Sequence, residues 1–159
     1  MSEYGNLESD ASRAFVRFER ELSAAIDVVW DLISTADGLA LWLSPAAVDL
    51  RMGGSVDLDF KEEGLAGGEI ISFEPGAVLE YHWQFPGEPD SVIRLELTET
   101  QTGTQLVLEH RLLPLDQAVA YGAGWHAHLD HLQAVATGET PDDWHDRFQN
   151  LLPHYAANV

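Results

Sequence analysis

The sequence predicts an α+β domain in which a long C-terminal helix packs on a curved antiparallel sheet of about seven strands, with two short helices after the first strand. Three observations lead to this fold class. Short strand-like runs follow one another between residues 47 and 112, separated by turn clusters such as residues 52–54. The intervals leave no room for crossover helices, so the strands should run antiparallel. After Pro114 the apolar spacing changes to three and four, which is typical of a helix.

The first third of the chain predicts a tail, a strand and two helices. Residues 1–12 lack periodicity and are expected to be a flexible tail, with residues 13–159 forming a single domain. Apolar residues alternate over residues 13–22, which predicts a strand. Ser23 is expected to cap a helix over residues 24–34, and Asp37 a second one that reaches Trp42.

The remaining elements are predicted from turn clusters and helical spacing. A helix is expected over residues 116–137, with a break or kink near Gly122 and Gly124, because glycine destabilises a helix interior. A last short helix is expected over residues 142–152, capped by Thr140. The predicted strands between these helical regions cover residues 47–50, 55–60, 67–73, 78–85, 91–98 and 105–112.

Charge and composition exclude several function classes. The 159 residues include 27 acidic and 8 basic ones, for a formal net charge of -19, which disfavours binding to nucleic acid or anionic lipid. The chain has no cysteine, so disulfides, thiolate zinc sites and cysteine nucleophiles are excluded. No apolar run is long enough for a membrane span and the start does not resemble a signal peptide, so a cytoplasmic location is expected. The sequence does not decide between a monomer and a homodimer.

Aromatic residues give the main indication of a binding site. Tyr81 and Trp83 lie two apart on a predicted strand, so both face one side of the sheet, and Trp125 lies on the helix expected to cover it. These residues either fill the core or line a cavity for a small apolar or amphipathic molecule. The residues expected to line such a cavity are Trp42, Phe60, Tyr81, Trp83, His110, Trp125 and Leu129.

His110 has two interpretations. Period two places it in a row of otherwise apolar inward side chains, where it either contacts a ligand or acts as a general base. The alternative is a core histidine hydrogen-bonded to a backbone carbonyl or to Tyr81.

The histidines of the long helix suggest a metal site, but each possible pair of ligands would need a third ligand from elsewhere. His126 with Asp130, and His128 with His131, are pairs at helical spacing. Because Trp125 and Leu129 occupy the predicted buried stripe, most of these histidines are expected towards the surface. No metal, cofactor or catalytic residue is therefore assigned.

Several short motifs follow one another in a fixed order along the chain. They are an alanine and a Val-Trp pair at residues 25–30, Leu41-Trp42 before Pro45, residues 52–54, 68–70, 79–83 and 103–106, Glu109-His110, and Gly124-Trp125. This ordered set resembles the homologues of the activator of the heat-shock-protein-90 ATPase, in the START and birch-pollen-allergen (SRPBCC) superfamily. The resemblance covers about residues 13 to 136 and implies a helix-grip fold that binds a small apolar or amphipathic molecule between helix and sheet. It does not extend to the additional N-terminal chaperone-binding domain of the eukaryotic activators, so it does not imply chaperone activation.

Three functions stay open at this point. The first is a binding module that holds a hydrophobic ligand without covalent chemistry. The second is an enzyme of the cyclase, hydratase or hydrolase type known in this superfamily, with His110 as acid or base and Tyr81 orienting the substrate. The third is a protein-interaction role, such as a chaperone co-factor, in which the acidic surface meets a basic partner.

Overall fold

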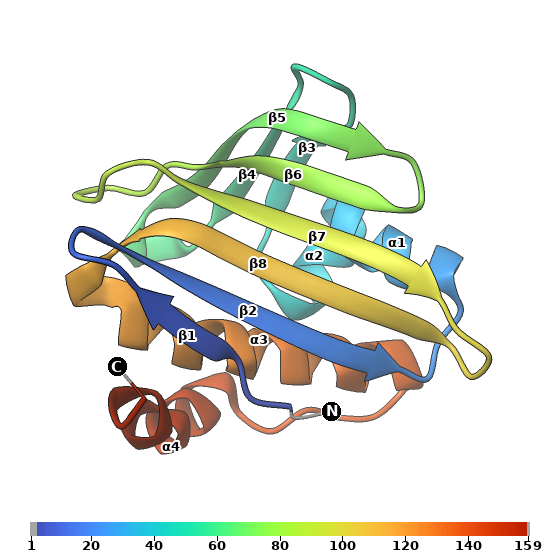
Figure 1. Ribbon diagram of the computed structural model, residues 1–159. Helices are drawn as coiled ribbons and strands as arrows, with labels where there is room; N and C mark the ends of the chain where they lie inside the picture. The colour runs from blue at the N-terminus through green and yellow to red at the C-terminus, as the bar shows by residue number, and fades with distance from the viewer. Residues whose placement is uncertain (1–2, 159) are drawn as a thin grey trace.

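The computed structural model describes residues 3–158 and contains one eight-stranded antiparallel sheet, in the order β1-β2-β8-β7-β6-β5-β4-β3 (Figure 1). The long helix α3 crosses one side of this curved sheet, which confirms the predicted fold class. The strands are β1 (Asn6–Ser9), β2 (Arg13–Leu22), β3 (Ala46–Asp49), β4 (Ser55–Asp59), β5 (Leu65–Glu74), β6 (Val78–Trp83), β7 (Ser91–Glu99) and β8 (Thr104–Pro114). The α-helices are α1 (Ile26–Ser34), α2 (Ala36–Trp42), α3 (Ala118–Thr137) and α4 (Trp144–Ala156), and short 3-10 helices cover Lys61–Glu63 and Leu115–Gln117.

The extra strand lies in the segment expected to be a flexible tail. β1 pairs with β2 from Asn6 opposite Arg17 to Ser9 opposite Ala14, so the tail prediction is wrong for these residues. Residues 1–2 lie outside the described part of the chain. β1 is mostly exposed and lacks alternation, so its pairing depends on the free edge of β2, which a local pattern does not reveal.

The strand prediction for residues 13–22 is confirmed, because every second residue of β2 is buried. Ala14, Val16, Phe18 and Leu22 face the core. Arg20 shares this inward row and is 4% exposed, and its Nη1 lies 3.1 Å from Asp130 Oδ1 on α3. The ion pair explains how a charge is tolerated in an apolar row.

Helix α3 is continuous through Gly122 and Gly124, so the break predicted there as one of two possibilities is absent. A Cβ atom at Gly122 would lie 2.8 Å from Cδ1 of Tyr155 on α4, so glycine here permits close approach of the two helices. α3 ends at Gly138, whose left-handed conformation at φ 76° is typical of a helix C-terminus.

The helix starts differ from the predicted caps. No side chain caps α1, so Ser23 does not have this role. Thr35, not Asp37, caps α2 by accepting from the Gly38 N–H, and Asp143, not Thr140, caps α4 by accepting from the Asp146 N–H. Asp and Thr occur near both starts, and only the backbone geometry decides which one accepts the bond.

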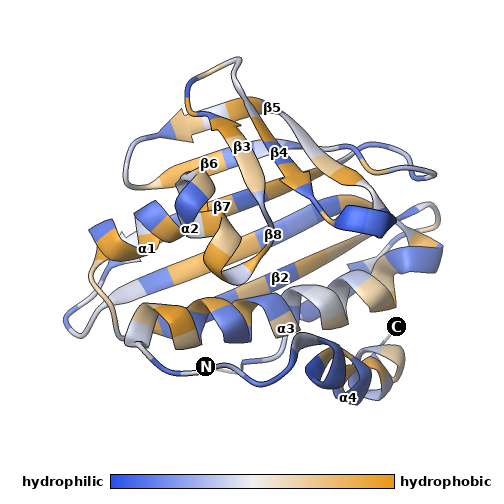
Figure 2. Cartoon of the chain, turned by 180° about the vertical axis from the view of Figure 1, so that it is seen from behind, coloured by the Kyte–Doolittle hydropathy of each residue, from blue (hydrophilic) through white to orange (hydrophobic). Residues whose placement is uncertain are grey.

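The core lies between the concave face of the sheet and α3, with α1 and α2 beside it. Figure 2 shows hydrophobic residues along the strands and on α1, whereas α4 is largely hydrophilic. α4 packs against α3 and contributes Leu151 and Tyr155 to the core. None of the described helices has the length and apolarity needed to cross a bilayer.

Candidate functional site

A pocket of about 390 Å³ lies between the first half of α3, the start of α4 and the loops that follow β4 and β6. Most of its lining is aromatic or aliphatic. α3 contributes Ala120, Tyr121, Gly124, Trp125 and His128, and α4 contributes Trp144 and Phe148. Leu43, Phe60, Glu63, Trp83, Phe85, Glu88 and Gln117 complete it.

The aromatic rings of the pocket contact one another in edge-to-face and stacked pairs. Trp83 meets Trp125 with centroids 5.5 Å apart and planes at 62°, and it meets Tyr121 at 6.2 Å and 80°. Trp144 and Phe148 of α4 stack at 4.9 Å. Both arrangements are favoured geometries for aromatic pairs, so the rings of the pocket walls support one another.

Only some of the residues that the sequence analysis assigned to a cavity line the pocket. Phe60, Trp83 and Trp125 line the pocket. The other four are Trp42, Tyr81, His110 and Leu129, which are almost fully buried in the core and do not line it. The indole N–H of Trp42, for instance, donates to the Leu32 carbonyl at 2.7 Å.

His110 lies directly behind the pocket wall, with both ring nitrogens engaged. The Trp125 indole N–H donates to Nδ1 at 2.9 Å, and Nε2 lies 2.8 Å from Ser91 Oγ. Because Nδ1 accepts, Nε2 carries the proton and donates to Ser91, whose hydroxyl is 3.4 Å from the Trp83 carbonyl. Complete burial lowers the pKa of His110 to about 3, so the ring is neutral at pH 7. Neither a backbone carbonyl nor Tyr81 is the observed partner.

A second hydrogen-bonded chain reaches the rim of the pocket. The Trp83 indole N–H donates to the Tyr121 hydroxyl at 2.9 Å, and that hydroxyl donates to Glu88 Oε1 at 2.7 Å. Burial, followed by the hydrogen bond to Glu88, raises the pKa of Tyr121. The hydroxyl therefore stays protonated and fixes the position of the Glu88 carboxylate.

His126 is fully buried, so the expectation that most helix histidines face the surface is wrong for this residue. Its Nδ1 lies 2.8 Å from the Tyr155 hydroxyl, and Arg147 Nη2 donates to its Nε2 at 3.3 Å. Burial, then the charge of Arg20, lowers the pKa of His126 to about 4, and Asp130 opposes them. α4 covers this helix face, which the pattern of α3 alone did not indicate.

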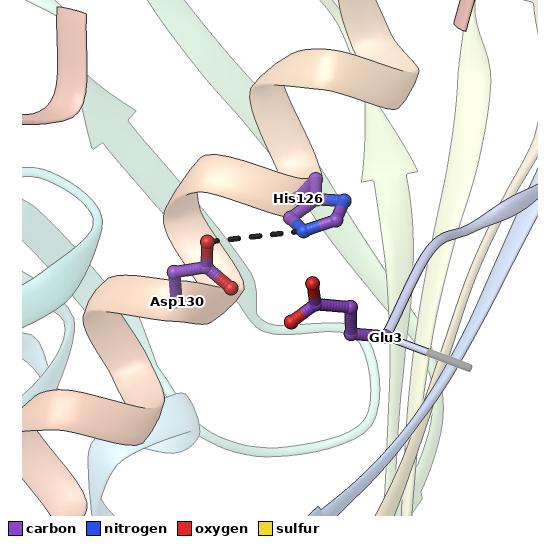
Figure 3. A group of neighbouring side chains, drawn as sticks. All are labelled: Glu3, His126 and Asp130. Atoms are coloured by element: carbon purple, nitrogen blue, oxygen red, sulfur yellow. Dashed lines mark ion pairs between the residues drawn. The ribbon is translucent and has the colours of Figure 1, made fainter. Parts of the chain in front are cut away.

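Glu3, His126 and Asp130 form the group of possible metal ligands shown in Figure 3, with ligand atoms within 4.8 Å of one another. Asp130 already pairs with two guanidinium groups, at 3.1 Å from Arg20 and 2.7 Å from Arg147. A metal ion would have to displace or approach both positive charges, so this group fits an ion-pair network better than a metal site.

His128 is also more enclosed than expected, between the rings of Trp125, Phe60 and Trp144. Burial lowers its pKa to about 3, and hydrogen bonding to the Trp42 backbone opposes this. Its Nδ1 is buried without a hydrogen-bond partner among the described residues. Nε2 of His131, three residues further along α3, lies 2.7 Å from the Asp142 carbonyl oxygen.

Sequence reasoning missed much of the pocket's outer wall. Phe85, Glu88, Tyr121, Trp144 and Phe148 line the pocket but were not assigned to a site. Trp144 and Phe148 are four residues apart, so they share one face of α4 and gave a usable signal. The element that this face contacts was not predictable from the spacing.

Comparisons with known proteins agree with the fold. A family model described as "Activator of Hsp90 ATPase homolog 1-like protein" matches residues 23–137. CalU16 from Micromonospora echinospora is 27% identical over 97% of this chain and 94% of its own, with a TM-score of 0.80. The protein encoded by gene BPP1335 of Bordetella parapertussis is 27% identical over 96% and 88%, with a TM-score of 0.76.

A more distant structure shares the fold. DynU16, a protein of the dynemicin biosynthetic locus, is 24% identical over 79% of this chain and 48% of its own, with a TM-score of 0.71. No curated protein matches the sequence. Because the family model spans most of the chain and the helix-grip fold agrees with it, the chain belongs to the Activator of Hsp90 ATPase homolog 1-like family of the SRPBCC superfamily.

Proposed function

We propose that this protein binds one small, mainly apolar molecule in the pocket between α3, α4 and the loops after β4 and β6, without covalent chemistry. The observation that carries the proposal is the pocket itself, whose volume of about 390 Å³ falls in the range typical of small-molecule sites. Its walls are aromatic rings, and an apolar ligand that enters would remove their faces from water.

The position of His110 supports binding over catalysis. A general acid or base must come within hydrogen-bond reach of the substrate, directly or through one water. His110 is behind Trp83 and Trp125, and its two nitrogens are held by Trp125 and Ser91. This arrangement supports a structural role in which His110 fixes the two tryptophans of the wall.

Tryptophans in the wall provide a direct assay. A panel of lipids, aromatic compounds and polyketides should contain ligands that change tryptophan fluorescence and raise the melting temperature, because a ligand that binds only the folded state stabilises it. Ala120→Phe places a ring in the pocket and should abolish both effects.

The matched control is Ala47→Phe, because Ala47 is exposed on β3 and does not line the pocket. It should leave both effects unchanged. The proposal is contradicted if no compound produces a shift, or if Ala120→Phe binds as well as the parent protein.

A further inference from the structure

We propose that the pocket selects ligands in which a protonated amine is attached to an apolar or aromatic body, with the amine held by Glu88. This inference rests on the proposed function and names the chemical class of its ligand. Three features of the pocket point to it: the sign of its charges, the geometry of its rings and the state of its histidine.

Both charged residues that line the pocket are acidic. Among the described residues, the lining includes Glu63 and Glu88 and no lysine or arginine. Glu88 is half-buried, accepts from the Tyr121 hydroxyl, and has no ion-pair partner within the described chain. The buried Glu80 on β6 differs, because Arg94 lies 3.4 Å away and Arg111 also pairs with it.

A carboxylate beside apolar walls is more favourable when a cation accompanies it. At Glu80 the protein supplies the cation from its own strands. At Glu88 the protein supplies a hydroxyl, and the space next to the carboxylate is the pocket. A ligand amine would complete the pairing.

The aromatic walls add a second attraction for positive charge. The faces of Trp, Tyr and Phe rings carry negative electrostatic potential, and rings arranged around a space are a known way to bind ammonium groups. Trp83 stands steeply to both Tyr121 and Trp125, so these three lining rings differ in orientation. The same rings accommodate an apolar body.

His128 adds no opposing charge. Its burial keeps the ring neutral at pH 7. Its Nδ1 is buried without a hydrogen-bond partner among the described residues, so this nitrogen is available to a polar atom of the ligand. The Trp144 indole N–H, also buried without a described partner, offers one donor for an oxygen of the ligand body.

The net charge of the whole protein also favours a cationic ligand, and it acts at long range. A formal net charge of -19 on 159 residues favours the approach of cations and disfavours anions. This field alone would not define a site, but it adds to the two carboxylates at the pocket.

The test uses three probes with one common body: 4-phenylbutylamine, 4-phenylbutanol and 4-phenylbutyrate. Binding is followed by tryptophan fluorescence at low ionic strength. The amine should bind about tenfold more tightly than the alcohol, and the carboxylate should bind most weakly. Glu88→Gln should lower amine affinity by about tenfold and leave alcohol affinity unchanged.

Glu62→Gln is the matched control, because Glu62 is exposed and does not line the pocket. It removes the same charge and should change amine affinity less than twofold. Equal affinity for amine and alcohol, or equal losses from Glu88→Gln and Glu62→Gln, would overturn the inference. If none of the three probes binds while members of the broader panel do, the inference fails and the proposed function stands; if nothing binds in either experiment, both fail.

Discussion

Two layers of side chains between α3 and the sheet differ in how their polar groups are satisfied. In the inner layer, behind the pocket wall, His110 bonds through one nitrogen to Trp125 and through the other to Ser91. In the pocket layer, His128 Nδ1 and Trp144 Nε1 are buried without partners among the described residues. Burial nevertheless lowers the pKa of His110 and of His128 to about 3. Burial therefore sets the charge state of these histidines, and their partners distinguish a structural residue from one available to a ligand.

The largest expected effect is a difference in stability between two variants. One changes Trp125, which joins the two layers, and the other changes Phe60, which lies on the pocket side. Trp125→Ala should cost about 3 to 5 kcal/mol, because it removes a ring that is 3% exposed and leaves His110 Nδ1 unpaired. Phe60→Ala should cost about 1 to 2 kcal/mol, because Phe60 is only partly buried. Urea denaturation of both variants measures the difference, and equal losses would contradict the division into layers.

Acid should destabilise both layers alike. Well above pH 6.5 the two histidines are neutral in both the folded and unfolded states. As the pH falls below 6.5, the unfolded chain takes up protons that the folded His110 and His128 refuse until about pH 3, so stability is lost across that window. At pH 5.5 the loss should be about 1.4 kcal/mol for each histidine.

Urea denaturation at pH 7 and at pH 5.5 checks this expectation. His110→Gln and His128→Gln should each reduce the loss between the two pH values by about 1.3 kcal/mol. A loss that neither variant changes would show that other groups cause it.

Alanine substitutions at two glycines of α3 test how closely α4 packs against this helix. Gly122→Ala should destabilise by about 1 to 3 kcal/mol, because its Cβ would lie 2.8 Å from the Tyr155 ring. Gly124→Ala should stabilise by up to about 1 kcal/mol, because its Cβ would meet Trp144 at 3.9 Å and alanine favours helix. Thermal melts of the pair give the sign of each change, and a stabilising Gly122→Ala would mean that α4 packs differently.

The smallest expected difference in stability is between variants of the two hydrogen-bonded chains, the buried one through His110 and the one at the pocket rim through Tyr121. Ser91→Ala leaves the buried Nε2–H of His110 unpaired and should cost about 1 to 3 kcal/mol. Tyr121→Phe removes the acceptor for the Trp83 indole at the pocket rim, where water can replace it, and should cost about 1 kcal/mol or less. Chemical denaturation decides the order, and a larger cost for Tyr121→Phe would place the more important chain at the rim.

Local patterns were sufficient for most of the fold. The alternation of Ala14, Val16 and Phe18 predicted β2 because side chains of a strand point to opposite faces in turn. The turn clusters predicted the antiparallel order of strands, and the spacing of Trp125 and Leu129 predicted the buried stripe of α3. The same alternation placed Tyr81, Trp83 and His110 on the inner side of the sheet.

The site depended on contacts between segments far apart in the chain. β1 forms because β2 offers a free edge, and His126 is buried because α4 and residues near the N-terminus cover it. Trp144 and Phe148 line the pocket only because α4 folds back onto α3. Periodicity tells which side of an element is apolar and does not tell which element will cover it. The sequence by itself therefore determined the layers and their facing residues, whereas the tertiary structure decided that His110 is enclosed by Trp125 and Ser91 and that the pocket opens beside Glu88.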